Sequence, residues 1–65
     1  MEEVTFYELK KGDNVWFKSP YNTFSHWGTV KDFHYNFEGD PYVTIAVGKA
    51  TVMKAYENFK FIAED

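Results

Sequence analysis

The fold of this chain is decided by residues 42–54, YVTIAVGKATVMK. Val43, Ile45 and Val47 recur at every second position, which is the period of a strand that buries one face. The glycine and lysine that follow form a short turn of the kind that joins two antiparallel strands, and residues 50–54 return as the second strand. This hairpin predicts an all-β domain.

A longer strand is predicted before the hairpin, over residues 26–36. Val30 and Phe33 lie three positions apart, which breaks the two-residue period of a strand. One extra residue in a β-bulge at residues 31–32 restores the period and places Val30, Phe33 and Tyr35 on one face.

Shorter strands, loops and turns are predicted around these strands. Residues 15–17, Val-Trp-Phe, predict the first strand because aromatic and β-branched residues favour strands. Residues 18–25 are rich in Ser, Pro, Asn and Thr and predict a long loop. Residues 38–41 predict a turn.

The N-terminal segment carries a capping-box pattern, Thr5 followed three residues later by Glu8. The pattern predicts one helical turn that ends at Gly12, since glycine tolerates the left-handed backbone of a helix exit. Val4, Phe6 and Glu8 also alternate, so the start of a strand is the alternative interpretation.

The C-terminal segment has two interpretations as well. Residues 55–58 can form one 3-10 turn before a last strand over residues 59–62. Three apolar side chains are also spaced as on one face of a helix, so an amphipathic helix over residues 50–63 is the alternative. The β-branched pair at residues 51–52 and the Phe-Lys-Phe alternation favour strands.

Composition limits the chain to one small domain, residues 1–65. Without cysteine there is no disulfide, so the seven Phe, five Tyr and two Trp must supply much of the core. The net charge of −3 and the absence of Arg oppose strong nucleic-acid binding, although residues 9–56 carry six Lys against four acids. The acidic start and the lack of a long apolar run predict a cytoplasmic protein.

Three segments resemble SH3-like small barrels. Residues 9–17, LKKGDNVWF, resemble their Leu-x-x-Gly-Asp-x-Val opening, and residues 28–33, GTVKDF, are similar to the Gly-Thr-Val segment of KOW domains. Residues 52–62 resemble the KOW closing segment. The resemblance implies a five-stranded SH3-like barrel of the KOW or Tudor kind, with a 3-10 turn before the last strand. Such barrels bind peptides, methylated side chains, nucleic acid or other proteins.

The aromatic side chains divide between core and surface. The expected core contains Phe6, Phe17, Phe33, Tyr35, Tyr56 and Phe59 with Leu9, Val15, Val30, Val43, Ile45, Val47, Val52 and Ile62. The aromatic residues left for the outside or the loops are Tyr7, Trp16, Tyr21, Phe24, Trp27, Phe37, Tyr42 and Phe61.

This surplus predicts a binding surface, because Tyr and Trp are enriched at binding hot spots. The long loop and the turn at residues 38–41 would form an aromatic groove, with lysines at its rim. The predicted partner-binding residues are Tyr21, Phe24, Trp27, Tyr42, Trp16, Lys18 and Lys31.

The function expected from this surface is docking onto a protein partner, without catalysis or a cofactor, as in a bacteriophage or bacterial accessory protein. A KOW-like module that binds RNA or single-stranded DNA is the alternative, with bases stacked on Trp16, Trp27 or Tyr21. An acidic mimic or inhibitor is a weaker alternative, if Glu2 and Glu3 meet residues 64–65 where the termini come together.

Catalytic and metal chemistry has little support in the sequence. His26, His34 and Asp32 are types that bind metals, but their spacing matches no metal motif. Ser25, His26 and Asp32 are the residue types found in a nucleophile triad, but a triad is defined by the geometry of its side chains and not by the presence of these residue types alone. We therefore expect neither a metal site nor an enzyme.

Overall fold

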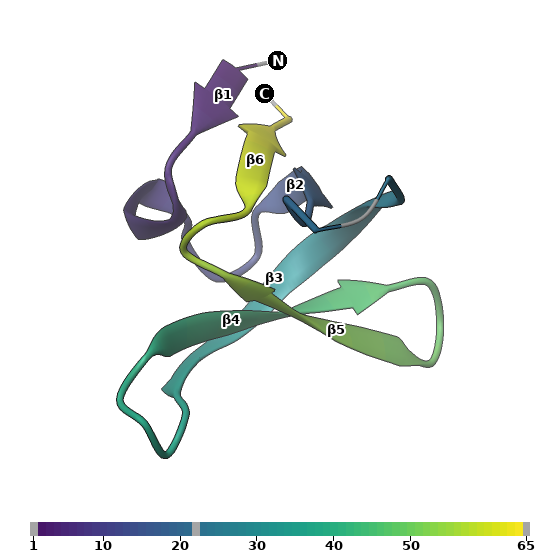
Figure 1. Ribbon diagram of the computed structural model, residues 1–65. Helices are drawn as coiled ribbons and strands as arrows, with labels where there is room; N and C mark the ends of the chain where they lie inside the picture. Colours follow the sequence, from purple (N-terminus) through teal and green to yellow (C-terminus); the bar gives the residue numbers. More distant parts are fainter. Residues whose placement is uncertain (1, 22, 65) are drawn as a thin grey trace.

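The computed structural model describes residues 2–21 and 23–64 and is all-β apart from one 3-10 turn (Figure 1). In chain order the elements are β1 (Glu2–Val4), η1 (Phe6–Glu8), β2 (Asn14–Lys18), β3 (Ser25–Tyr35), β4 (Pro41–Val47), β5 (Thr51–Tyr56) and β6 (Lys60–Ala63). The predicted all-β class is confirmed. The helical alternative for residues 50–63 is wrong, because these residues form β5, a turn and β6.

The described strands form one antiparallel sheet in the order β1-β6-β2-β3-β4-β5. No strand pairing among the described residues joins β1 to β5, so the sheet is not closed into a barrel. Its curvature still lets both halves share one core, since Phe61 on β6 and Ala55 on β5 are fully buried in the same cluster. Figure 1 shows the two termini next to each other, where β1 pairs with β6.

The hairpin that decides the fold is confirmed. β5 pairs with β4 along its whole length, and the connecting turn begins at Gly48, which has a φ of 73°. Val43 and Ile45 are fully buried, while Val47 packs against the core from a partly buried position. The alternation of apolar positions therefore gave the correct inner face of β4.

The β-bulge in β3 is also confirmed, since the register with β4 shifts between Val30 and Asp32. The bulge does not bring every expected side chain into the core. Val30 is buried, but Phe33 is 40% exposed and Tyr35 is 76% exposed. β3 is long, and its last residues extend beyond the core, where Tyr35 pairs with Pro41 at the end of the sheet. The prediction of Tyr35 as a core residue is wrong.

The inner faces of the last two strands differ from the prediction by one residue. Pairing with β4 sets Val43 opposite Ala55 and Ala46 opposite Val52, so Ala55 is buried and Val52 is 60% exposed. Phe61, expected outside, is fully buried. A shift of one residue exchanges the two faces of a strand. In β6 the Phe-Lys-Phe alternation does mark the inner face, since Lys60 is exposed and Phe61 is buried, whereas β5 has no such alternation. Ile62, expected inside, is only partly buried, and so are Tyr56 and Phe59.

The helical-turn interpretation of the N-terminal segment is confirmed, although the turn ends at Glu8 rather than at Gly12; the strand alternative fails at Phe6 and Glu8, which lie in η1. Residues 2–4 form strand β1, and η1 then buries Phe6 against the core. The expected 3-10 turn at residues 55–58 is not formed. β5 continues to Tyr56, and a turn follows in which the amide of Phe59 donates to the carbonyl oxygen of Tyr56 at 3.0 Å.

The capping box makes a testable contribution at acid pH. Glu8 Oε1 accepts hydrogen bonds from the amide and the hydroxyl of Thr5, both at 3.0 Å. The bond from the amide, and then the bond from the hydroxyl, lower the pKa of Glu8 below its ordinary value of 4.5. The folded state therefore gains stability above pH 4.5 that is lost as the pH falls through the lowered pKa.

We expect Glu8→Gln to flatten this part of the acid dependence. The measurement is the melting temperature of both proteins between about pH 6 and pH 3, the range in which a glutamate of lowered pKa titrates. An unchanged slope in the variant would show that the carboxylate of Glu8 does not stabilise the first turn.

Candidate functional site

A surface groove lies where three segments of the chain meet. The first loop contributes Ser19 and Tyr21, the entry to β4 contributes residues 40–41, and the turn after β5 contributes residues 56–59. The groove encloses about 440 Å³, within the range of about 300–1,000 Å³ typical of ligand sites. Its lining residues are Ser19, Tyr21, Asp40, Pro41, Tyr56, Glu57, Asn58 and Phe59.

Hydrogen bonds within the 36–40 turn fix the wall at residues 40–41. Asn36 Oδ1 accepts from the amides of Glu38 and Asp40, both at 2.9 Å. The amide of Asn36 in turn donates to the carbonyl oxygen of Asp40 at 2.9 Å. Gly39, with a φ of 90°, supplies the left-handed backbone that closes this turn. The position of Asp40 is therefore set by the turn itself.

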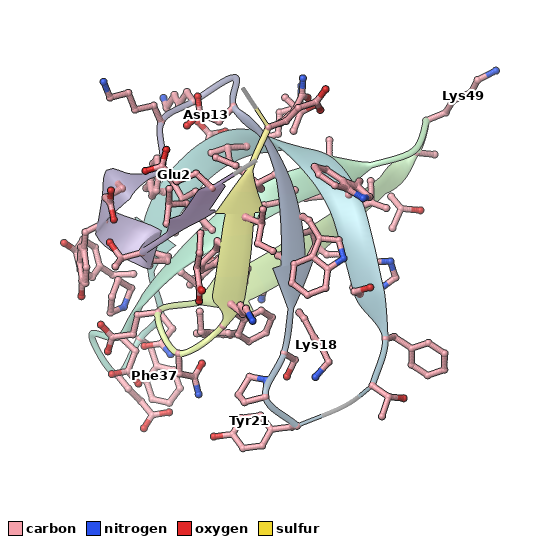
Figure 2. The ribbon with its side chains drawn as sticks, turned by 90° about the horizontal axis from the view of Figure 1, so that it is seen from above. Glu2, Asp13, Lys18, Tyr21, Phe37 and Lys49 are labelled. Carbon is pink, nitrogen blue, oxygen red and sulfur yellow. The ribbon has the colours of Figure 1, made fainter. Side chains whose placement is uncertain are left out.

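Tyr21 forms the opposite wall from the first loop. Its amide donates to Ser19 Oγ at 3.1 Å, and its hydroxyl accepts from Asn58 Nδ2 at 3.3 Å. The ring is 84% exposed although its hydroxyl is held. Figure 2 shows Tyr21 and Lys18 on the same side of the molecule, far from Lys49 at the end of the β4–β5 hairpin. Tyr21 therefore offers an open aromatic surface in a defined place.

A row of aromatic rings supports the groove from below. Tyr42 lies 5.7 Å from Tyr56, Tyr56 lies 6.1 Å from Phe59, and Phe59 lies 6.5 Å from the buried Phe61, all between ring centroids. Lys54 Nζ lies 5.2 Å from the centroid of Tyr42, in a cation–π contact. The floor is thus connected to the core by direct packing, which makes it rigid.

The charge of the groove is acidic. Asp40 and Glu57 line it, and no lysine does. Glu57 also accepts a hydrogen bond from the hydroxyl of Tyr7, which raises the pKa of that tyrosine and ties η1 to the turn after β5. Lys18, one of the lysines predicted at the rim, adjoins the groove, since its Nζ donates to the carbonyl oxygen of the lining residue Ser19.

A second hollow adjoins the groove at Pro41, which lines both. It encloses about 250 Å³ between η1 and the end of β3. Its lining residues are Phe6, Tyr7, Phe33, His34, Tyr35 and Pro41. The Tyr7–Glu57 hydrogen bond joins a lining residue of one hollow to a lining residue of the other.

The structure divides the predicted binding residues among three places. Tyr21 lines the groove, and Tyr42 contacts its floor through Tyr56. Phe24 lines a hollow of about 200 Å³ that adjoins the groove, since Ser19 and Phe59 line both.

Of the other predicted binding residues, Lys18 adjoins the groove through Ser19, whereas Trp16, Trp27 and Lys31 do not line it. Trp16 and Trp27 are paired on neighbouring strands. Lys18 Nζ donates to the carbonyl oxygen of Ser19 at 3.4 Å, and Lys31 is exposed at the bulge of β3. The single aromatic groove expected from the loop is thus only partly assembled.

Sequence reasoning missed the part of the groove that comes from the turn after β5. Tyr56 and Phe59 were expected in the core, and Glu57 and Asn58 were given no role. The spacing of Tyr56 and Phe59 resembled that of side chains on a buried face. Only the pairing of Tyr42 with Tyr56 places the turn after β5 at the surface. Three segments that are distant in the sequence meet only in the tertiary structure, so local sequence patterns could not predict the groove.

The residues considered for metal or catalytic chemistry are not brought together. The ring of His26 lies 5.8 Å from Phe17, whereas His34 stacks on Tyr42 at 5.1 Å. Asp32 forms an ion pair with Lys11 at 3.1 Å. Among the described residues there is no cluster of three or more side chains able to hold a metal ion.

The acidic termini do meet, since Glu2 pairs with Ala63 and Glu3 with Ile62. Asp65, the remaining member of the predicted acidic patch, lies outside the described residues. No helix in the described part of the chain is long and apolar enough to cross a membrane. No family model, curated protein or solved structure matches this chain.

Proposed function

We propose that this chain is a small, non-catalytic docking module that binds an extended segment of a protein partner in the groove between Tyr21, Pro41 and Phe59. The observation that carries the proposal is the groove itself, which three separate segments form over a rigid aromatic floor. Aromatic-lined grooves are a recurring way to bind extended or polyproline-type segments.

The chemistry of the groove defines the ligand further. Tyr21, Tyr56 and Phe59 offer apolar ring surface for proline or aliphatic side chains. Asp40 and Glu57 offer carboxylates to Lys or Arg, and Asn58 can donate or accept hydrogen bonds from a peptide backbone. We therefore propose a partner segment that combines apolar and basic residues.

An SH3-like barrel of the KOW or Tudor kind remains our proposal for the wider relationship of this domain. The order of elements supports it, with a first strand, a long loop, a long bulged strand, a hairpin and a last strand after a tight turn. Residues 9–17 support it at the level of sequence. In this proposal β2 to β6 are the five SH3-like strands, in a sheet that is curved but not closed, and β1 is an addition beside β6.

The test is selection from a displayed library of random peptides. We expect the wild-type protein to enrich peptides with basic and apolar residues, and Tyr21→Ala to lose about tenfold or more in affinity for them, as for a hot-spot aromatic residue. Phe37→Ala is the matched control, because Phe37 is an exposed aromatic residue of the 36–40 turn that does not line the groove. Both variants should keep the melting temperature of the wild type.

Two results would contradict the proposal. One is a library that enriches no peptide on the wild-type protein. The other is a set of enriched peptides that bind Tyr21→Ala and Phe37→Ala equally well.

A further inference from the structure

The outer face of β6, β2 and β3 carries an apolar patch that the proposed docking groove does not use. The pairings Trp16–Trp27 and Trp16–Ile62 place these three side chains in one row across the sheet, and the pairing of Ile62 with Glu3 sets an exposed carboxylate of β1 at the edge of that row. Trp27 is 46% exposed, and Trp16 and Ile62 are partly buried. Val15 and Phe17, the neighbours of Trp16, are fully buried, so the row points away from the core. We call Trp16, Trp27 and Ile62 the tryptophan face.

Opposite charges lie at the two ends of this face. Lys60 and Lys18 are directly paired on one side of the row. On the other side, Glu64 follows β6, and its amide donates to the carbonyl oxygen of Asn14 at 3.0 Å. Along β6 the outward positions therefore read Lys60, Ile62, Glu64, and four residues of strand separate the two charges by about 13 Å.

Neither end is neutralised by a charge of the described residues. The one ion pair in residues 2–21 and 23–64 joins Lys11 to Asp32, so Lys18, Lys60 and Glu64 have no partner of opposite charge there. Two like charges directly opposite each other on a sheet are unfavourable. An external carboxylate beside Lys18 and Lys60 would relieve this repulsion.

A basic end, an apolar centre and an acidic end form a pattern that is complementary to itself. A twofold axis through the centre sets the basic end of one copy against the acidic end of the other. Small domains without disulfides or metals commonly gain stability by such association. We propose that two copies of this chain form a symmetric dimer through the tryptophan face, with Lys60 of each copy facing Glu64 of the other.

The dimer should be weak. A standard interface buries about 800 Å² on each partner, which is a large share of the 4631 Å² surface of the described chain. The face spans only three strands, so we expect an association in the micromolar range. Sedimentation at concentrations from about 5 µM to about 500 µM spans such a transition, and the mass should rise from monomer to dimer.

Charge reversal tests the arrangement directly. Lys60→Glu makes both ends of β6 acidic, and Glu64→Lys makes both ends basic. We expect each variant alone to associate at least about tenfold more weakly than the wild type, because like charges then meet across the axis. An equimolar mixture of the two variants should restore the dimer, since an acidic face then meets a basic one.

Trp27→Ser provides the apolar test and Val52→Ser its control. Val52 is an exposed apolar residue on the outer face of β5, outside the tryptophan face. We expect Trp27→Ser to remain a monomer and Val52→Ser to dimerise like the wild type, with both variants folded by circular dichroism. Peptide binding in the groove should survive in Trp27→Ser, which separates this inference from the docking proposal.

Three outcomes would overturn the dimer. The first is a wild-type protein that stays monomeric across the whole range, and the second is a mixture of charge-reversed variants that fails to associate. The third is a monomer that binds a single-stranded oligonucleotide with strong salt dependence and loses that binding in Trp27→Ser, which would assign the face to nucleic acid instead.

Discussion

Replacing Phe61 with alanine is expected to leave this domain largely unfolded at room temperature. Phe61 is fully buried on β6 and packs against Phe59 and Phe6. Truncating a buried phenylalanine costs about 3–5 kcal/mol, and a chain of this length has a total stability of about 3–10 kcal/mol. Urea unfolding followed by tryptophan fluorescence measures the loss.

Val52→Ala is the control that makes this result specific to the register of the last strands. Val52 is 60% exposed on the outer face of β5, so its truncation should cost less than about 1 kcal/mol. If Val52→Ala destabilised the protein more than Phe61→Ala, the inner faces of β5 and β6 would be the reverse of those in the structure.

Gly28→Ala is expected to be nearly as damaging, for a different reason. A Cβ atom at this position would lie 2.5 Å from Ile45 Cγ2 and 2.6 Å from the carbonyl oxygen of Ala46. That oxygen belongs to β4 and cannot move without breaking the sheet. Overpacking of this kind costs about 1–3 kcal/mol or more, and the midpoint of thermal unfolding should fall by about 10 °C or more.

Gly48→Ala is the comparison for Gly28→Ala. At Gly48 nothing lies within 4 Å of an added Cβ, but the φ of 73° disfavours any other residue. The expected cost there is about 1–2 kcal/mol, from backbone strain alone. A Gly28→Ala protein at least as stable as the wild type would mean that β3 and β4 do not approach each other as described.

Local pattern in the sequence was sufficient for the centre of the sheet. The alternation in β4, the turn at Gly48 and the extra residue in β3 each follow from the two-residue period of strands. The register of β5 was not predictable in the same way, because Val52, Tyr56 and Phe59 have a helix-like spacing. In β6 the Phe-Lys-Phe alternation does mark the inner face, since Lys60 is exposed and Phe61 is buried.

The candidate site was predictable only where it depends on one loop. Tyr21 was identified because the first loop concentrates aromatic residues, and it does line the groove. Trp27 was grouped with it by proximity in sequence, but β3 carries Trp27 to the outer face beside Trp16. Asn58 and Glu57 reach the groove through the turn after β5, and their place depends on pairing between distant strands.

The most direct test of the docking proposal is an NMR titration of the labelled protein with a basic peptide from the selected set. We expect the amide signals that shift to belong to Tyr21, Asp40, Asn58 and Phe59, and we expect Asp40→Asn to weaken binding of that peptide. The account would be contradicted if the amide signals of the groove residues did not shift and the only shifts belonged to Trp16 on β2 and Trp27 on β3.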